Sequence, residues 1–178
     1  MQTIRTLQTL PLIVSLLAVF PACAEAQLER LLGGKELPTI STDELHNLLT
    51  EQQQAETRAK ELGQPLPAAD FVVVDVRSAA EVKISVIPGA VTQEQYEKNV
   101  DEYRDRLVIP YCTVGGRSSA YARKLDQAGV KVQNYKGSIL EWVRAEKPLE
   151  TLDGKATNRV HIYSDRYRIP PKYQAVTE

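Results

Sequence analysis

Apolar runs alternate with helix-like segments along most of this chain of 178 residues. Residues 71–74 (FVVV) and 107–111 (LVIPY) are continuous apolar runs, a pattern typical of strands buried on both faces of a parallel sheet. Residues 130–135 (VKVQNY) alternate apolar and polar positions and predict a further strand. Strands that alternate with helices indicate an α/β domain with a central, mainly parallel sheet.

The clearest helix signal lies at the start of the folded region. Ser41 and Glu44 have the spacing of a capping box, and Ile40 with Leu45 has the spacing of a hydrophobic staple. The glycine and proline of residues 63–65 then end the pattern. We therefore predict a helix that continues through a Gln- and Glu-rich surface segment; a partner-binding role for that segment is the alternative.

Two more segments have helical spacing. Residues 93–106 are polar with Tyr96, Val100 and Tyr103 on one side, and residues 119–128 form a helix-like run that ends at Gly129. A glycine directly after the last helical residue is a common C-terminal signal. Both segments are therefore predicted to be helical.

Shorter elements complete the pattern. Residues 78–81 and 139–142 predict short helical turns, and residues 87–91 (IPGAV) predict a turn followed by a short strand. Residues 151–178 differ in character, because breakers such as Asp-Gly and Pro-Pro interrupt them. Within this segment residues 160–163 predict an extra edge strand, and the rest is expected to be irregular and packed by its tyrosines.

The first 26 residues have the pattern of an export signal. Arg5 supplies a positive charge, residues 10–20 form an uncharged apolar core, and residues 22–26 offer A-x-A cleavage sites. The strongly apolar core is short for a membrane span, so we expect cleavage and a periplasmic or secreted protein without a stable span. A lipid anchor on Cys23 is the alternative, because the residues before it loosely resemble a lipobox.

Composition narrows the class of protein. The chain is 43% hydrophobic with a formal net charge of −1, which fits one globular domain and leaves no basic footprint for nucleic acid. The predicted organisation is a signal peptide at 1–26, a domain at 27–150 and a C-terminal extension at 151–178.

The chain has two cysteines, Cys23 and Cys112, so removal of the signal leaves one thiol. Cys112 follows the apolar run 107–111 and opens a glycine-containing loop, 112–118, that leads into a helix. Backbone N–H groups in such a loop form an anion-binding nest and favour the reactive thiolate. The alternative is a small buried side chain followed by a simple turn.

Four elements, in order, resemble the rhodanese superfamily of sulfurtransferases. They are D-x-R-x-x-x-E at 75–81, I-P-G-A at 87–90, the active-site loop Y-C-T-V-G-G-R-S at 111–118, and N-Y-K-G-S with a tryptophan at 134–142. The resemblance spans residues 38–148. It implies a three-layer α/β/α domain around a central, mainly parallel sheet.

The resemblance implies that Cys112 is the catalytic nucleophile. Its thiolate takes a sulfane sulfur from a donor such as thiosulfate, holds it as a persulfide and passes it to a thiol or cyanide; a protein thiol is another candidate acceptor. No cofactor is implied, and the two scattered histidines, His46 and His161, with one cysteine do not make a metal site.

The remaining candidate residues divide into two sets. Loop N–H groups are expected to stabilise the anionic sulfur and Arg117 to orient an anionic donor, with support of the loop as its other role. The predicted substrate-binding residues are Thr113, Val114, Gly115, Gly116, Arg117 and Ser118. The residues predicted to support the site are Asp75, Arg77 and Glu81. Lys136 is either an attractor of anionic donors or a solvated lysine.

Two rival functions remain open. Four residues separate Cys112 from Arg117, whereas the cell-cycle phosphatases that resemble rhodaneses have five, so the shorter ring favours sulfur transfer over phosphatase or arsenate-reductase chemistry. A non-catalytic persulfide carrier or partner-binding module is the second rival.

The chain also departs from the family at Ser85-Val86, where many members have Gly-His, which removes one polar group near the site.

Overall fold

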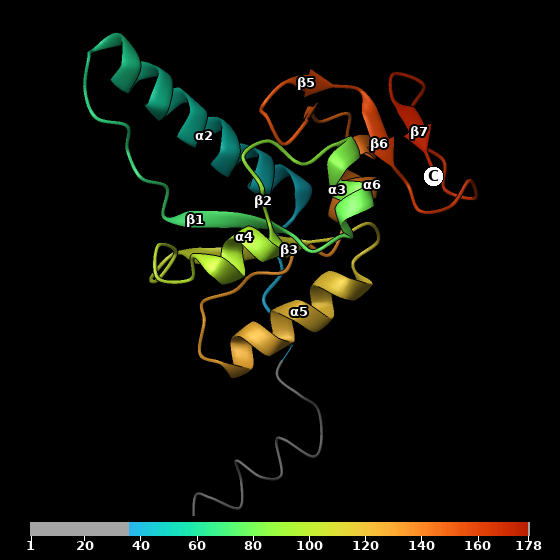
Figure 1. Cartoon of the computed structure of the whole chain (residues 1–178), viewed down its shortest axis with the longest axis horizontal. Helices are drawn as coiled ribbons and strands as arrows, with labels where there is room; N and C mark the ends of the chain where they lie inside the picture. The colour runs from blue at the N-terminus through green and yellow to red at the C-terminus, as the bar shows by residue number, and fades with distance from the viewer. Residues whose placement is uncertain (1–35, 178) are drawn as a thin grey trace, which may run out of the picture. The chain divides into compact units, whose positions relative to one another are not determined.

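The computed structural model of the chain describes residues 36–177 (Figure 1). The predicted export signal and Cys23 lie outside the described residues. Residues from Leu37 onward form one compact unit. Among the described residues, no helix is long and apolar enough to cross a membrane.

A parallel sheet with the strand order β2-β1-β3 lies at the centre of this unit. Strand β1 (Phe71–Asp75) pairs along its whole length with β3 (Leu107–Tyr111), and its carboxyl end pairs with β2 (Val91–Thr92). All five residues of β1 are buried, as expected for a continuous apolar run covered on both faces. Both strands predicted from apolar runs are confirmed.

The sheet continues beyond β3 through less regular pairing. Val132 bridges Val108, and Asn134 bridges Thr39, both in parallel. The Val108 N–H donates to the carbonyl of Lys131 at 2.9 Å, so the segment around residues 131–134 lies alongside β3. The alternating pattern at 130–135 therefore marks the right position, but two bridges replace the regular strand that it predicts.

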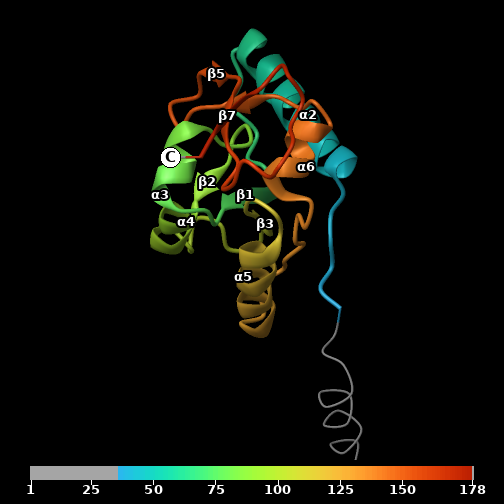
Figure 2. The ribbon, with the colours of Figure 1, turned by 90° about the vertical axis from the view of Figure 1, so that its right-hand side faces the viewer.

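Helices cover both faces of the sheet (Figures 1 and 2). They are α2 (Thr42–Glu61), α3 (Ala79–Ile84), α4 (Gln93–Lys98), α5 (Gly116–Gln127) and α6 (Ser138–Arg144). Phe71 and Val73 join a buried cluster with α2 and α6, whereas Val72 and Val74 join a second cluster with α4 and α5. The alternation of side chains along β1 thus supplies both cores, and the three-layer α/β/α architecture is confirmed.

Capping boxes define the starts of three helices. Ser41 and Glu44 form the predicted box at α2, which runs to Glu61 before the glycine and proline that were expected to end it. Ser78 and Glu81 form a second box at α3. In each box, the two side chains accept hydrogen bonds from two backbone N–H groups that have no partner within the helix.

The helix predicted over residues 93–106 is too long. Helix α4 ends at Lys98, and the residues that follow form turns. The Asn99 side chain donates to the carbonyl of Gln95 at 2.8 Å, while its backbone has left the helical region. Tyr96 and Tyr103 still stack, with ring centroids 5.6 Å apart, so the apolar spacing reflects packing across a turn.

Residues after 148 form two small sheets. Strands β4 (Leu149–Glu150) and β5 (Ala156–Thr157) pair antiparallel, and β6 (Arg159–His161) pairs in parallel with β7 (Gln174–Val176). The edge strand predicted at residues 160–163 is present in part as β6, which pairs with β7 in a separate small sheet. Val160 and Ile162 are buried in the cluster that contains α2 and α6, so β6 covers that face instead of extending the central sheet.

Candidate active site

Cys112 directly follows β3 and is only 1% exposed to solvent. The loop turns at Gly115, whose φ of +93° is unfavourable for residues with a side chain. A Cβ atom at this position would also lie 2.3 Å from the carbonyl oxygen of Lys136. Glycine is therefore required at 115 both by the backbone conformation and by close packing against the next loop.

Helix α5 begins at Gly116, three residues earlier than the predicted helix-like run. Because Gly115 turns the chain sharply, the N–H groups that follow are available near the cysteine rather than within the helix. Gly129 has a φ of +78° just beyond the helix, as its C-terminal position predicts.

Hydrogen-bond donors converge on the sulfur of Cys112. The N–H of Gly115 donates to Sγ at 3.1 Å, and the Ser138 hydroxyl lies 3.8 Å from Sγ. Burial raises the pKa of the Cys112 thiol, but hydrogen bonds from the N–H groups of Ser118, Val114 and Gly115 and from Ser138 outweigh burial. The net pKa is lower than that of an ordinary thiol, which favours the nucleophilic thiolate.

Ser138 is a site residue that the sequence analysis did not single out. It is fully buried, and its hydroxyl accepts a hydrogen bond from the N–H of Cys112 at 3.0 Å. Its backbone has a φ of +56°, where non-glycine residues are uncommon. The sequence feature that could have identified Ser138 is its place after Gly137 in the segment that resembles the family. No local rule connects it to a cysteine 26 residues earlier.

Glu81 and Arg117 brace the loop beside Cys112. Arg117 donates to both Glu81 oxygens, from Nη1 at 2.7 Å and from Nη2 at 2.8 Å, and Nη2 also donates to Thr113 Oγ1 at 2.9 Å. Thr113 in turn donates to Glu81 at 2.7 Å. The planar guanidinium is thus held by a bidentate ion pair, so Arg117 supports the loop; its orientation of an anionic donor remains a prediction.

Asp75 and Arg77 form a separate, fully buried cluster. Nη2 of Arg77 donates to Asp75 at 2.6 Å and to the carbonyl of Ser85 at 2.6 Å. The Tyr111 hydroxyl donates to Asp75 at 2.5 Å and accepts from the N–H of Ile87 at 3.0 Å. These contacts tie the end of β1 to the end of β3 and to the turn at 85–87.

The charges in this cluster shift the pKa values of its members. Burial lowers the pKa of Arg77, but the charges of Asp75, Tyr111 and Glu81 and the hydrogen bonds to Asp75 together outweigh burial and raise it, so the guanidinium stays charged. Burial, with the charge of Asp75, raises the pKa of Tyr111 well above its usual value, so the phenol stays protonated and donates. The predicted support residues therefore divide into Glu81, which contacts the loop, and an Asp75–Arg77 pair behind it.

The other loop positions have distinct surroundings. Ser118 is fully buried and its hydroxyl donates to the carbonyl of Gly115 at 3.2 Å, so it supports the turn rather than capping α5. The Val114 side chain is exposed, with a relative exposure of 51%. A Cβ at Gly116 would meet nothing within 4 Å.

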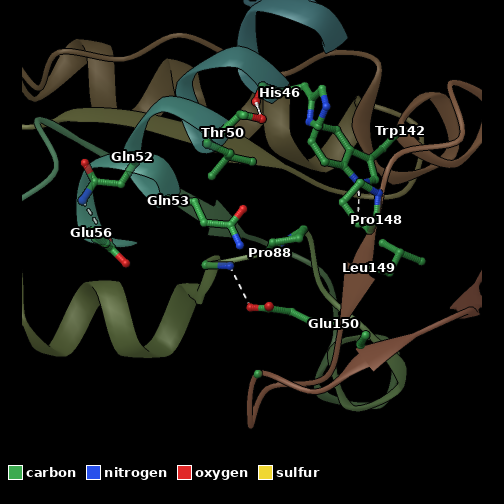
Figure 3. A pocket seen from close by; sticks show the side chains of 14 residues that line it. His46, Thr50, Gln52, Gln53, Glu56, Pro88, Trp142, Pro148, Leu149 and Glu150 are labelled. Carbon is green, nitrogen blue, oxygen red and sulfur yellow. Dashed lines mark hydrogen bonds between the residues drawn. The ribbon is translucent and has the colours of Figure 1, made fainter. Parts of the chain in front are cut away.

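A cavity of about 500 Å³, drawn in Figure 3, has no contribution from Cys112 to its walls. It is bounded by α2, the Pro88-Gly89 turn and the β4–β5 hairpin, and it contains none of the predicted site residues. The His46 ring lies edge-on to Trp142 here, with centroids 5.7 Å apart, and Glu150 accepts the N–H of Gly89 at 2.8 Å. His161 has a local structural contact instead: its Nδ1 accepts a hydrogen bond from the N–H of Tyr163.

Comparison with known proteins agrees with this arrangement. The family model named Rhodanese-like domain matches residues 58–145, which include Cys112 and its loop. A sulfurtransferase from Allochromatium vinosum is 32% identical over 89 residues, covering 48% of this chain and 83% of that protein. A tRNA sulfurtransferase from Desulfurococcus amylolyticus is 36% identical over 73 residues, which cover 41% of this chain.

The chain spans only 15% of the length of the Desulfurococcus protein. Among solved structures, a rhodanese-like domain protein from Staphylococcus aureus is 24% identical, with a TM-score of 0.47; the match covers 65% of this chain and 98% of that one. The family match includes the cysteine loop, and the Allochromatium protein is covered over most of its length at 32% identity. This chain therefore belongs to the rhodanese-like domain family, which includes sulfurtransferases.

Proposed function

We propose that this protein is a sulfurtransferase that carries a sulfane sulfur as a persulfide on Cys112. The donor is a small sulfur compound such as thiosulfate, and the acceptor is a thiol or cyanide. The proposal rests on one observation above the others: backbone N–H groups of the loop converge on Cys112 Sγ and lower its pKa despite burial.

The chemistry needs two steps of nucleophilic displacement. The Cys112 thiolate attacks the outer sulfur of thiosulfate, and the S–S bond of the donor breaks, with its electron pair leaving on sulfite. An acceptor thiolate or cyanide then attacks the outer sulfur of the persulfide, and the electron pair of that S–S bond returns to Cys112 Sγ. Loop N–H groups stabilise the anionic sulfur throughout, in the manner of an oxyanion hole.

The similarity to two sulfurtransferases, from Desulfurococcus amylolyticus and Allochromatium vinosum, supports the same class of reaction. The spacing of Cys112 and Arg117 supports it too, since four residues enclose a smaller ring than the five of the phosphatase relatives. The bidentate pair between Arg117 and Glu81 keeps this short loop in place.

Intact-mass spectrometry tests the proposal. After incubation with thiosulfate, the protein is expected to gain the mass of one sulfur atom and to lose it on addition of cyanide. Cys112→Ser should gain nothing, whereas the matched variant Cys23→Ser, made in the chain that keeps residues 1–26, should behave like the same chain without the substitution. Absence of the added sulfur in the unmodified protein would contradict the proposal, and loading without repeated thiocyanate formation would favour the carrier alternative.

A further inference from the structure

A second cavity, of about 430 Å³, lies beside the active-site loop. Its walls include Val114 of the loop, Lys136 and Leu140 of the following segment, Arg144 of α6 and Tyr167 of the C-terminal extension. Its volume lies within the range of small-molecule sites, about 300–1,000 Å³. One residue from outside the family match, Tyr167, thus helps to shape a cavity at the edge of the proposed reaction centre.

Short-range contacts connect this cavity to Cys112. The carbonyl of Lys136 packs directly against Gly115, whose N–H donates to Cys112 Sγ at 3.1 Å. Gly137, another wall residue, precedes Ser138, whose hydroxyl lies 3.8 Å from the same sulfur. The cavity therefore lies just outside the groups that hold the nucleophile.

The charges around the cavity favour an anionic occupant. Within residues 36–177, Lys136 forms no ion pair, while Arg144 is only loosely paired with Glu141 at 3.5 Å. The two cations outnumber the one carboxylate in the wall. A carboxylate on the occupant would be attracted by the exposed ammonium of Lys136.

The other walls favour an occupant with an organic body. Val114 presents an exposed aliphatic side chain and Tyr167 a half-buried aromatic ring, while the buried Leu140 adds an apolar wall. Such surface gains nothing from a small inorganic ion but stabilises carbon atoms by removing them from water.

We propose that this cavity is the subsite for the sulfur acceptor and that it selects organic thiols that carry a carboxylate. The inference rests on the proposed sulfurtransferase function. The carboxylate lies near Lys136, the organic body packs between Val114 and Tyr167, and the thiolate attacks the outer sulfur of the Cys112 persulfide. That sulfur moves to the acceptor, and Cys112 is released as a thiolate. The C-terminal extension thereby contributes to the choice of acceptor.

The test compares two acceptors on protein already loaded with sulfur. Glutathione, which has two carboxylates, is compared with neutral 2-mercaptoethanol at equal thiolate concentration, and the decay of the persulfide is followed by rapid mixing and mass spectrometry. Taking the ratio of the two rates removes any effect on loading by the donor. The unmodified protein is expected to prefer glutathione, and added salt is expected to weaken that preference.

Two variants remove the proposed contacts. Lys136→Gln should lower the ratio of glutathione to 2-mercaptoethanol rates about threefold to fivefold, the effect of one exposed ion pair. Tyr167→Ala should lower it about threefold through lost apolar contact. The matched controls are Lys131→Gln and Tyr163→Ala, which alter an exposed lysine and an exposed tyrosine outside the cavity wall and should keep the original ratio.

The outcomes separate the two proposals. If the unmodified protein forms no persulfide with thiosulfate, the proposed function itself fails. If it loads and transfers sulfur but shows no preference for glutathione, or if both cavity variants keep the original ratio, the acceptor subsite is overturned. Lys136→Gln alters an exposed side chain, so it keeps the test decisive even if Tyr167→Ala unfolds.

Discussion

Replacing Glu81 by glutamine should destabilise the protein through its active-site loop. The carboxylate accepts hydrogen bonds from Arg117 at 2.7 and 2.8 Å, from Thr113 at 2.7 Å, and from the hydroxyl and N–H of Ser78 at 2.8 and 3.0 Å. Glutamine has nearly the same shape, but one oxygen becomes an NH₂ group. The new NH₂ group is itself a donor and would face the donors of neighbouring residues. The hydrogen bonds that the replaced oxygen accepted are therefore lost.

Removing one partner of a buried ion pair costs about 3–5 kcal/mol. Glu81 has only 5% of its side chain exposed, but Arg117 has 44% exposed, so water can solvate part of the released guanidinium. We therefore expect a loss of about 2–3 kcal/mol in the free energy of unfolding, below the full buried value. Glu94→Gln is the matched control, because it breaks an exposed pair with Lys98 that water and salt screen, so it should cost far less than Glu81→Gln.

The pH dependence gives an independent check. Burial raises the pKa of Glu81, but hydrogen bonds from Arg117, Thr113 and Ser78 outweigh burial and hold the pKa well below its usual range. A carboxyl with a lowered pKa contributes stability that is complete above its unfolded value, about 4.3, and is lost as the pH falls through the folded pKa. The stability gap between the unmodified protein and Glu81→Gln should therefore be widest near neutral pH and narrow in acid.

Urea unfolding measured by fluorescence provides the assay, because Trp142 is the single tryptophan of the chain and is fully buried. Each variant is measured at neutral pH and at several acidic values at which it still folds. Equal stability losses for Glu81→Gln and Glu94→Gln, or a gap that does not change with pH, would refute the reasoning.

Three further predictions concern the loop. Gly115→Ala should distort the site and reduce persulfide formation at least tenfold, whereas Gly116→Ala, which meets no neighbouring atom, should keep most of it; mass spectrometry after thiosulfate distinguishes them. Alkylation of Cys112 by iodoacetamide should rise with pH around a midpoint below that of an ordinary exposed thiol, and Ser138→Ala should move that midpoint upward; an unchanged midpoint would argue against the hydroxyl as a donor. Arg117→Lys should lower the melting temperature because one ammonium cannot replace the fork that engages both oxygens, and an unaltered melt would leave anion orientation as its main role.

Much of the local structure could be predicted because its causes lie within a few residues. The capping box of Ser41 and Glu44 spans one helical turn, and the apolar run of β1 is itself the buried strand. The same local rules failed at residues 93–106. There Tyr96 and Tyr103 stack across a turn. In the sequence this spacing cannot be distinguished from that of a helix.

The site was less accessible to local reasoning. Cys112 was found because a cysteine between a strand and a glycine turn has a recognisable pattern. Ser138 was not, since its hydrogen bonds to Cys112 cross 26 residues. The support residues Asp75, Arg77 and Glu81 were predicted as one group, yet Glu81 contacts the loop, whereas Asp75 and Arg77 form a separate buried pair.

The sequence by itself predicted most of the elements, their order and the place of the candidate nucleophile, because strand burial, helix caps and glycine turns depend on near neighbours in the chain. Only the tertiary structure decided which distant groups meet. It pairs Arg117 with Glu81, lowers the pKa of Cys112 through converging N–H groups, and sets Tyr167 beside Lys136 in one cavity. Those effects arise from distances and burial between residues far apart in sequence, and no local pattern contains that information.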